Sequence, residues 1–337
     1  MRGTTALGMA PLAIAVGLLL GGCGGGGGGT GGDDDAADGW AQPATGPGSA
    51  VYGHASYAVY RSGTSATDYW LYTPTGPVPA TAPVVIFNHG WSALTPSYYE
   101  AWIIHLVRKG NIVIFPRWQS FVGDLNGSSF LPNAATAVRA ALTRLETSGP
   151  VTPDRTQVAV FGHSIGSVLA ADMAAAWATL SIPQPLACFS VEPGTVSSAT
   201  GVTVANDVTI SDFSQIAATT LLISLLGEDD LLVGDTLARQ IYQESTTVLA
   251  ANKNLLTVHS DGHGTPALTA NHLFPLASAD GSNVDALDYY ALWKIGDALL
   301  DATFRGTNRE YALGDTDEQR YMGAWPDGTP VTEMTVQ

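Results

Sequence analysis

The clearest chemical signature in this chain is Gly162-His163-Ser164-Ile165-Gly166, which follows an apolar run and precedes a stretch of small residues. Gly-x-Ser-x-Gly between a strand and a helix is typical of a nucleophile elbow, a strained turn that exposes a serine hydroxyl above a sheet. Side chains at the two glycine positions would collide with the helix and a neighbouring strand. The turn also places the Ile165 N–H at a helix N-terminus, where it can stabilise an oxyanion. The pattern predicts Ser164 as a nucleophile and Ile165 as an oxyanion-hole donor.

Such a serine needs a sheet and helices to position it, and the surrounding sequence predicts both. Apolar runs without polar alternation, interspersed with helical patterns, indicate a mostly parallel sheet covered on both faces. An opening hairpin is expected at 51–61 and 69–73, and residues 195–214 read as a short insertion or lid rather than a large cap. The expected later strands are 83–90, 111–115, 157–161, 186–191, 220–226 and 255–259, and the expected helices are 97–109, 133–147, 166–180, 236–251 and 288–304.

With this order of elements around the serine, the chain resembles the α/β-hydrolase superfamily over about residues 50–305. The triad of that family runs serine, acid, histidine along the chain, which implies an acid downstream of Ser164. Residues 221–233 resemble the family's strand end, where an acid stands three residues after a glycine. That match implies Asp230 as the acid that orients the histidine. The alternatives are its neighbours Asp229 and Glu228, and Glu192 at the end of the preceding strand, where some family members carry the acid.

The resemblance implies that the histidine follows the last strand, and three histidines compete for that role. His263 lies between glycines in the turn beyond the strand end, where triad members gather, and is the predicted base. His259 is still inside the strand pattern and is expected to pack or cap, whereas His272 lies further along the chain. His259 and His263 are also four residues apart, but an extended chain separates them by about 13 Å, too far to share one metal ion. We therefore expect no metal and no cofactor.

The loop after the third strand is expected to supply the second oxyanion donor. Asn88-His89-Gly90-Trp91 resembles the family's His-Gly element, which implies that the Trp91 N–H is that donor and that His89 braces the loop. Aromatic residues at this end of the sheet are candidates for an apolar substrate pocket. The alternative is that half of them belong to the core. The candidate substrate-binding residues are Trp91, Tyr98, Trp118 and Phe121.

The N-terminus carries targeting signals. Arg2 precedes an apolar run over 6–20 that is too short for a membrane span and typical of a signal peptide. Leu20-Gly21-Gly22-Cys23 resembles a bacterial lipobox, which implies cleavage before Cys23 and lipidation of that cysteine. The alternative is an ordinary signal with a chance cysteine. Residues 24–35 are almost entirely glycine and aspartate, a composition that predicts a flexible tether.

Length and charge narrow the range of functions. The chain has 337 residues, 45% of them hydrophobic, which suits one domain after removal of the targeting sequence. Its formal net charge of −16 disfavours nucleic acid as a partner. We expect a signal peptide at 1–22, a lipidated cysteine and tether at 23–49, a hydrolase domain at 50–305 and a C-terminal extension at 306–337 that packs on it. The expected location is the bacterial cell envelope, lipid-anchored at the outer membrane, periplasm or cell surface, with secretion as the alternative.

These observations predict a serine hydrolase that cleaves carboxylic esters through an acyl-enzyme. The short insertion and aromatic rim resemble compact esterases, including relatives of dienelactone hydrolase, platelet-activating-factor acetylhydrolase and cutinase-like polyesterases. The expected substrate is a small-molecule, lipid or polymer ester, and the membrane is expected to be met only through the lipid anchor. Lipase, polyesterase and peptidase activities are alternatives. A non-catalytic surface-binding protein is the rival outside enzymes, because a fold does not dictate a function.

Overall fold

The structure is a computed structural model that describes residues 40–278, 280–281 and 283–337. The predicted signal peptide, Cys23 and most of the predicted tether lie outside these residues. Among the helices that are described, none has both the length and the apolar character needed to cross a bilayer.

One sheet organises the described chain, with strands in the order β1-β2-β4-β3-β5-β6-β7-β8-β9. The strands from β4 through β3 and on to β8 pair in parallel, whereas β1, β2 and β9 pair antiparallel with their neighbours. The antiparallel pairing of β1 with β2 is the predicted opening hairpin. The strands are β1 Ser56–Arg61, β2 Tyr69–Thr75, β3 Thr81–Asn88, β4 Ile112–Pro116, β5 Thr152–His163, β6 Ala187–Val191, β7 Leu221–Gly227, β8 Lys253–Val258 and β9 Thr335–Val336.

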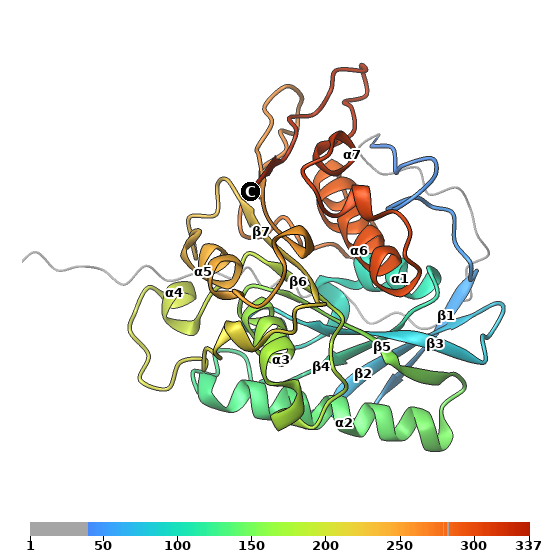
Figure 1. Cartoon of the computed structure of the whole chain (residues 1–337), viewed down its shortest axis with the longest axis vertical. Helices are drawn as coiled ribbons and strands as arrows, with labels where there is room; N and C mark the ends of the chain where they lie inside the picture. Colours follow the sequence, from blue (N-terminus) through green and yellow to red (C-terminus); the bar gives the residue numbers. More distant parts are fainter. Residues whose placement is uncertain (1–39, 279, 282) are drawn as a thin grey trace, which may run out of the picture. The chain divides into compact units, whose positions relative to one another are not determined.

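Helices cover both faces of this sheet (Figure 1). Consecutive strand residues point to opposite faces, so Val84 and Ile86 of β3 pack with α2 and α3, while Val85 and Phe87 pack with α1 and α6. The helices are α1 Glu100–Arg108, α2 Phe130–Ser148, α3 Ile165–Leu180, α4 Val196–Thr200, α5 Thr236–Glu244, α6 Lys294–Phe304 and α7 Asp317–Arg320, with a π-helix η5 at Leu287–Trp293 and 3₁₀ turns η1 Pro96–Tyr98, η2 Gly127–Ser129, η3 Phe213–Gln215, η4 Ala250–Asn252 and η6 Arg309–Tyr311.

This arrangement confirms the predicted α/β-hydrolase fold, with a mostly parallel sheet, helices on both faces and a short insertion instead of a cap domain. The insertion after β6 is folded around α4. The Asp207 carboxylate accepts hydrogen bonds from the Val196 and Ser197 N–H groups (2.8 and 2.9 Å), which caps that helix. The insertion therefore has a defined structure of its own and lies after the carboxyl end of β6.

Both flanks of the predicted domain pack against it. Residues 40–49, which we assigned to the tether, contact the domain: Trp40 packs against Trp325 with tilted rings (4.7 Å between ring centroids), and the Gly48 N–H donates to Asp297 (2.8 Å). The glycine and proline content of this segment resembles that of a linker, and it does not reveal that Trp40 packs on the domain. A prediction from composition therefore placed the end of the tether too late in the chain. Beyond residue 305, strand β9 pairs with the edge strand β8.

Candidate active site

Ser164 stands on a strained turn between β5 and α3. Its φ of 57° and ψ of −125° fall in a region that a residue with a side chain rarely adopts. A Cβ at Gly162 would overlap the carbonyl of Gly166, and a Cβ at Gly166 would overlap the carbonyl oxygens of Asn88 and His89. The two glycines therefore let the helix and β3 close tightly under the serine, as the Gly-x-Ser-x-Gly pattern predicts.

The side chain that meets Ser164 is His272. Its Nε2 lies 2.9 Å from the Ser164 Oγ, and its Nδ1 lies 2.8 Å from the Asp230 Oδ2. Because a carboxylate only accepts, Nδ1 carries the proton and Nε2 is free to accept the serine proton. All three residues are buried, and the second Asp230 oxygen accepts the N–H groups of Leu232 and Val233. The acid is thus fixed by backbone donors, and it fixes the tautomer of the histidine.

The expectation that His263 would meet Ser164 is wrong. His263 is exposed, its Nε2 is 2.8 Å from the Asp327 Oδ2, and its ring packs against Trp325. An antiparallel bridge between Asp261 and Leu268 closes the chain after β8 into a loop. His263 lies in this loop, beside the C-terminal extension. The Asp229 N–H then holds the Ala270 carbonyl (3.0 Å), and this contact returns the chain so that His272 faces the elbow. Spacing along the chain does not reveal such a reversal.

The structure separates the four candidate acids. Asp230 is the one that contacts the histidine beside the serine. Glu228 instead pairs with His259 (3.2 Å), and Asp229 accepts the Ser260 hydroxyl (2.6 Å). Glu192 lies close to the site but is further from the His272 Nδ1, at 3.8 Å.

The loop after β3 lies against Ser164. A Cβ placed on Gly90 would be 3.4 Å from the Ser164 Cβ, so the backbone of Gly90 borders the serine. The Ile165 N–H is the first of α3, at the positive end of that helix. The N–H groups of Trp91, directly after Gly90, and of Ile165 stay the predicted oxyanion donors. The side chain of Trp91 turns away, and its Nε1–H donates to the Asp124 carbonyl (2.7 Å).

Of the four predicted pocket residues, Trp118 belongs to the core. It is fully buried, stacks on His89 (4.1 Å between centroids, 9° between planes) and packs on Phe130. The Nδ1 and Nε2 of His89 lie 2.7 Å from the carbonyl oxygens of Gly90 and Arg117, and burial lowers the pKa of the ring to about 4. A neutral ring has one N–H, so it braces the loop by donating to one of these two carbonyls. An aromatic side chain at a strand end suits the core and a substrate pocket equally well. Residue type therefore does not separate the two roles, and only the packing of the folded chain does.

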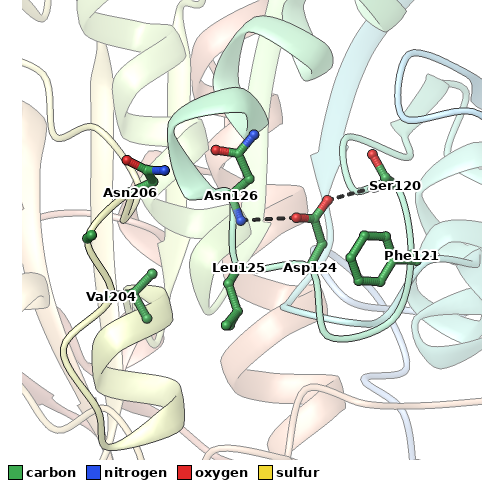
Figure 2. Close-up of a pocket in the computed structure, with 8 residues that line it drawn as sticks. Ser120, Phe121, Asp124, Leu125, Asn126, Val204 and Asn206 are labelled. Carbon is green, nitrogen blue, oxygen red and sulfur yellow. Dashed lines mark hydrogen bonds between the residues drawn. The ribbon is translucent and has the colours of Figure 1, made fainter.

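A pocket of about 570 Å³ opens between the loop after β4 and the insertion after β6 (Figure 2). Phe121 lines it on one side and is 59% exposed. The Trp91 Nε1–H donates to the Asp124 carbonyl, and this hydrogen bond links the loop after β4 to the loop after β3. Tyr98 lies elsewhere on the rim, half exposed, and its carbonyl accepts the Ala277 N–H in the segment that follows His272. The pocket is lined by Ser120, Phe121, Asp124, Leu125, Asn126, Val204, Ala205 and Asn206.

A buried hydrogen-bond chain, missed by the sequence analysis, links the parts of this site. The Gly90 N–H donates to the Tyr99 hydroxyl (2.8 Å), and Tyr99 lies 2.8 Å from the His163 Nδ1. The His163 Nε2 faces the carbonyl of His272 (2.9 Å), which can only accept, so Nε2 holds the proton and Nδ1 accepts from Tyr99. His163, at the first variable position of the Gly-x-Ser-x-Gly pattern, thus connects the loop after β3 to the segment that carries His272.

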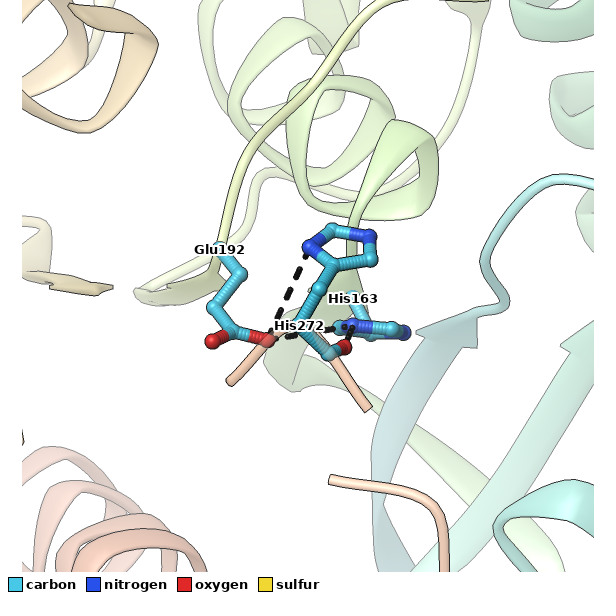
Figure 3. Close-up of side chains that lie close together, drawn as sticks. All are labelled: His163, Glu192 and His272. Atoms are coloured by element: carbon cyan, nitrogen blue, oxygen red, sulfur yellow. Dashed lines mark hydrogen bonds and ion pairs between the residues drawn. The ribbon is translucent and has the colours of Figure 1, made fainter. Parts of the chain in front are cut away.

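Three buried side chains here have the residue types of a metal site. One ligand atom each from His163, Glu192 and His272 lies within 4.8 Å of the other two (Figure 3). The nitrogens nearest to Glu192 are the His163 Nε2 and the His272 Nδ1, and both carry protons that are donated to oxygen acceptors. A metal ligand needs the lone pair of a deprotonated nitrogen, so these residues do not fit a metal ion in this arrangement.

This geometry can carry out nucleophilic acyl transfer. A hydroxyl contacts an imidazole, a carboxylate orients that imidazole, and the backbone of Gly90 and the N-terminus of α3 adjoin the serine. Those are the parts needed to attack a carbonyl carbon and to hold the negative charge that then develops on its oxygen.

Comparison with known proteins agrees with this reading. Residues 64–204 match the family model described as Chlorophyllase, a match that covers less than half of the chain. The matched segment holds β2 to β6 and the elbow serine, whereas Asp230 and His272 lie beyond it. Together with the fold, it supports the α/β-hydrolase superfamily and an esterase-type hydrolase. A search of curated proteins found no significant match.

Proposed function

We propose that this protein hydrolyses carboxylic esters through an acyl-enzyme formed on Ser164. The observation that carries the proposal is the continuous contact from Ser164 to His272 to Asp230 on a strained elbow. His272 removes the serine proton as the hydroxyl attacks the ester carbonyl, and the N–H groups of Trp91 and Ile165 stabilise the oxyanion. His272 then protonates the leaving alkoxide, and water repeats the sequence to release the acid.

Exposed apolar side chains around the site favour an ester with a substantial apolar part. They lie in loops that follow the carboxyl ends of strands, the edge at which Ser164 and Asp230 also lie. Leu231, directly after the proposed acid, is 94% exposed. Exposing a leucine side chain to water is unfavourable, and contact with an apolar substrate would offset that free energy. The exposed residues of this rim are Tyr98, Phe121, Val122, Leu125, Val202, Leu231, Leu232 and Leu273.

The proposal is tested by hydrolysis of a p-nitrophenyl ester series from acetate to palmitate by the purified full-length chain. We expect turnover by the native protein, and loss of about 10⁴-fold or more in Ser164→Ala, because the nucleophile is removed. A fluorophosphonate probe should label the native protein and not the variant. A protein that is folded but neither hydrolyses any ester nor reacts with the probe is not a serine hydrolase, and the binding-protein alternative then replaces this proposal.

Phe121→Ala is expected to weaken the handling of long acyl chains selectively. The ring is exposed in the pocket, so its removal takes away apolar contact area worth about 1–3 kcal/mol to a chain that reaches it. KM for the longest esters should rise while acetate turnover stays unchanged. Val59→Ala, which alters a similarly exposed residue on β1 at the sheet edge, is the matched control. An equal loss on short and long esters would show that Phe121 does not contact the acyl chain.

We also propose that the chain is anchored to a bacterial envelope membrane through lipid on Cys23. The support is the lipobox-like sequence, an apolar run of signal-peptide length and the Gly/Asp-rich segment that follows. Membrane fractionation and mass spectrometry of the native protein and of Cys23→Ala test this proposal. Only the native protein should be found in the membrane fraction and carry acyl groups.

A further inference from the structure

Glu192 is a buried carboxyl that the proposed mechanism leaves unused. It follows β6, between the ends of the strands that lead to Ser164 and Asp230. Its side chain is fully buried and no side chain of the described residues hydrogen-bonds its carboxyl oxygens, although the backbone of Gly227 contacts the carboxyl and lowers its pKa. Its Oε2 nevertheless lies 3.3 Å from the His163 Nε2 and 3.8 Å from the His272 Nδ1 (Figure 3).

The surroundings keep this carboxyl neutral. Burial raises the pKa of Glu192 well above its usual range, and the negative charge of Asp230 raises it further. The titratable groups that face it are His163, Asp230, His272 and Tyr99. Burial also holds the pKa of His163 well below its usual range, so that ring does not form a charged pair with Glu192. A buried carboxyl without a side-chain hydrogen bond is costly, and the backbone contact with Gly227 offsets only part of that cost.

The backbone around Glu192 is built to hold it there. The residue has a φ of 49°, in the left-handed region that a glutamate rarely adopts, and its N–H bonds the Leu225 carbonyl of β7 (2.7 Å). A Cβ placed on Gly227 would be 2.6 Å from the Glu192 Oε1, so the absence of a side chain at that position makes room for the carboxyl. The strained backbone of Glu192 and the missing side chain at Gly227 together let the carboxyl lie beside His272.

We propose that Glu192 is a reserve carboxylate for His272: it stays protonated while Asp230 is charged, and it takes over the Nδ1–H of His272 when the Asp230 charge is lost. This inference rests on the proposed function. In the exchange the Glu192 O–H bond breaks. Its proton passes to Asp230 where that carboxylate is the group that is neutralised, and to solvent where Asp230 has been replaced. The new carboxylate then accepts the Nδ1–H after the two groups close the distance of 3.8 Å. Burial is the first reason that Glu192 is neutral, and the charge of Asp230 adds to it because two neighbouring carboxyls avoid being charged together. Loss of that charge therefore lowers the pKa of Glu192 and favours its ionisation.

A double-mutant cycle on the full-length chain tests this inference. Glu192→Gln keeps the size and neutral charge of the protonated side chain, so it should change kcat/KM little. Asp230→Ala should lose only about 10–100-fold, because Glu192 then orients His272, whereas the double variant should lose about 10⁴-fold, the usual cost of a missing triad acid. In Asp230→Ala the remaining activity should rise with pH as Glu192 ionises, and this rise should be absent from the double variant.

Two outcomes of the cycle would overturn the inference: an Asp230→Ala variant as inactive as the double variant, or a Glu192→Gln variant as impaired as Asp230→Ala. The result is separable from the proposed function, which fails if the folded native chain neither hydrolyses an ester nor reacts with the probe, or if Ser164→Ala keeps its turnover and probe labelling. Thermal unfolding of each variant establishes that it is folded.

A stability measurement needs only the native chain and Glu192→Gln, and it stands even if the Asp230 variants do not fold. The unfolded chain releases the Glu192 proton near pH 4.3, whereas the folded chain retains it, so the native protein loses stability as pH rises above that value. Glu192→Gln lacks this loss. Its Tm relative to the native protein should therefore increase between pH 4 and pH 8. A difference in Tm that does not change with pH would mean that Glu192 is charged at rest, and the inference would be wrong.

Discussion

His272→Ala will reduce kcat/KM for ester hydrolysis by about 10⁴–10⁶-fold, the range found when the base of a serine triad is removed. The physical reason is that the Ser164 hydroxyl then has no acceptor for its proton, since the His272 Nε2 is the group that lies 2.9 Å from its Oγ. Steady-state kinetics on a short p-nitrophenyl ester measures the effect. Most of the loss should fall on kcat, because the base acts during the reaction and not in binding.

His263→Ala is the matched control, because it removes the same side chain from the same loop. We expect activity close to that of the native protein, since His263 is exposed and pairs with Asp327 instead of the elbow. The reverse result, with His263 essential and His272 dispensable, would mean that the chain after β8 returns to the site by a different path in solution.

Gly166→Ala will lower the free energy of unfolding by about 3 kcal/mol or more, or prevent folding, because the added methyl group overlaps two backbone carbonyls. Those carbonyls belong to Asn88 and His89, which lead into the proposed oxyanion loop, and backbone yields far less than a flexible side chain. Urea denaturation measures the loss. Any folded fraction should also show a lower kcat, since the strand that carries the loop must move.

Gly53→Ala is the control for this substitution, because a Cβ at Gly53 meets no atom within 4 Å. Its unfolding free energy should stay near that of the native chain. If the two alanine variants were equally stable, α3 would have to stand further from β3 than the structure places it.

Several site features are local in the chain and could be predicted from the sequence. The elbow at Ser164 depends on glycines two residues away and on an apolar strand directly before it, all within one short segment. Asp230 stands at the end of β7, and parallel strands bring their carboxyl ends to one edge of the sheet. The strands themselves could be located because residues buried on both faces leave continuous apolar runs.

Other features arise from contacts between distant segments. The Asp261–Leu268 bridge decides that His272, and not the nearer His263, reaches Ser164. Trp118 belongs to the core because His89 and Phe130 enclose it, and Trp40 is held by Trp325 from the other end of the chain.

The sequence by itself determined the fold class, the nucleophile elbow and the edge of the sheet where the site had to lie, because short-range sterics and the burial of alternate residues leave their pattern along the chain. The tertiary structure decided which histidine meets the serine, and it placed Tyr99, His163 and Glu192 around that histidine. Loop reversals and buried polar contacts join residues far apart in the chain. No local pattern records them, since their energy depends on partners that only the folded chain brings together.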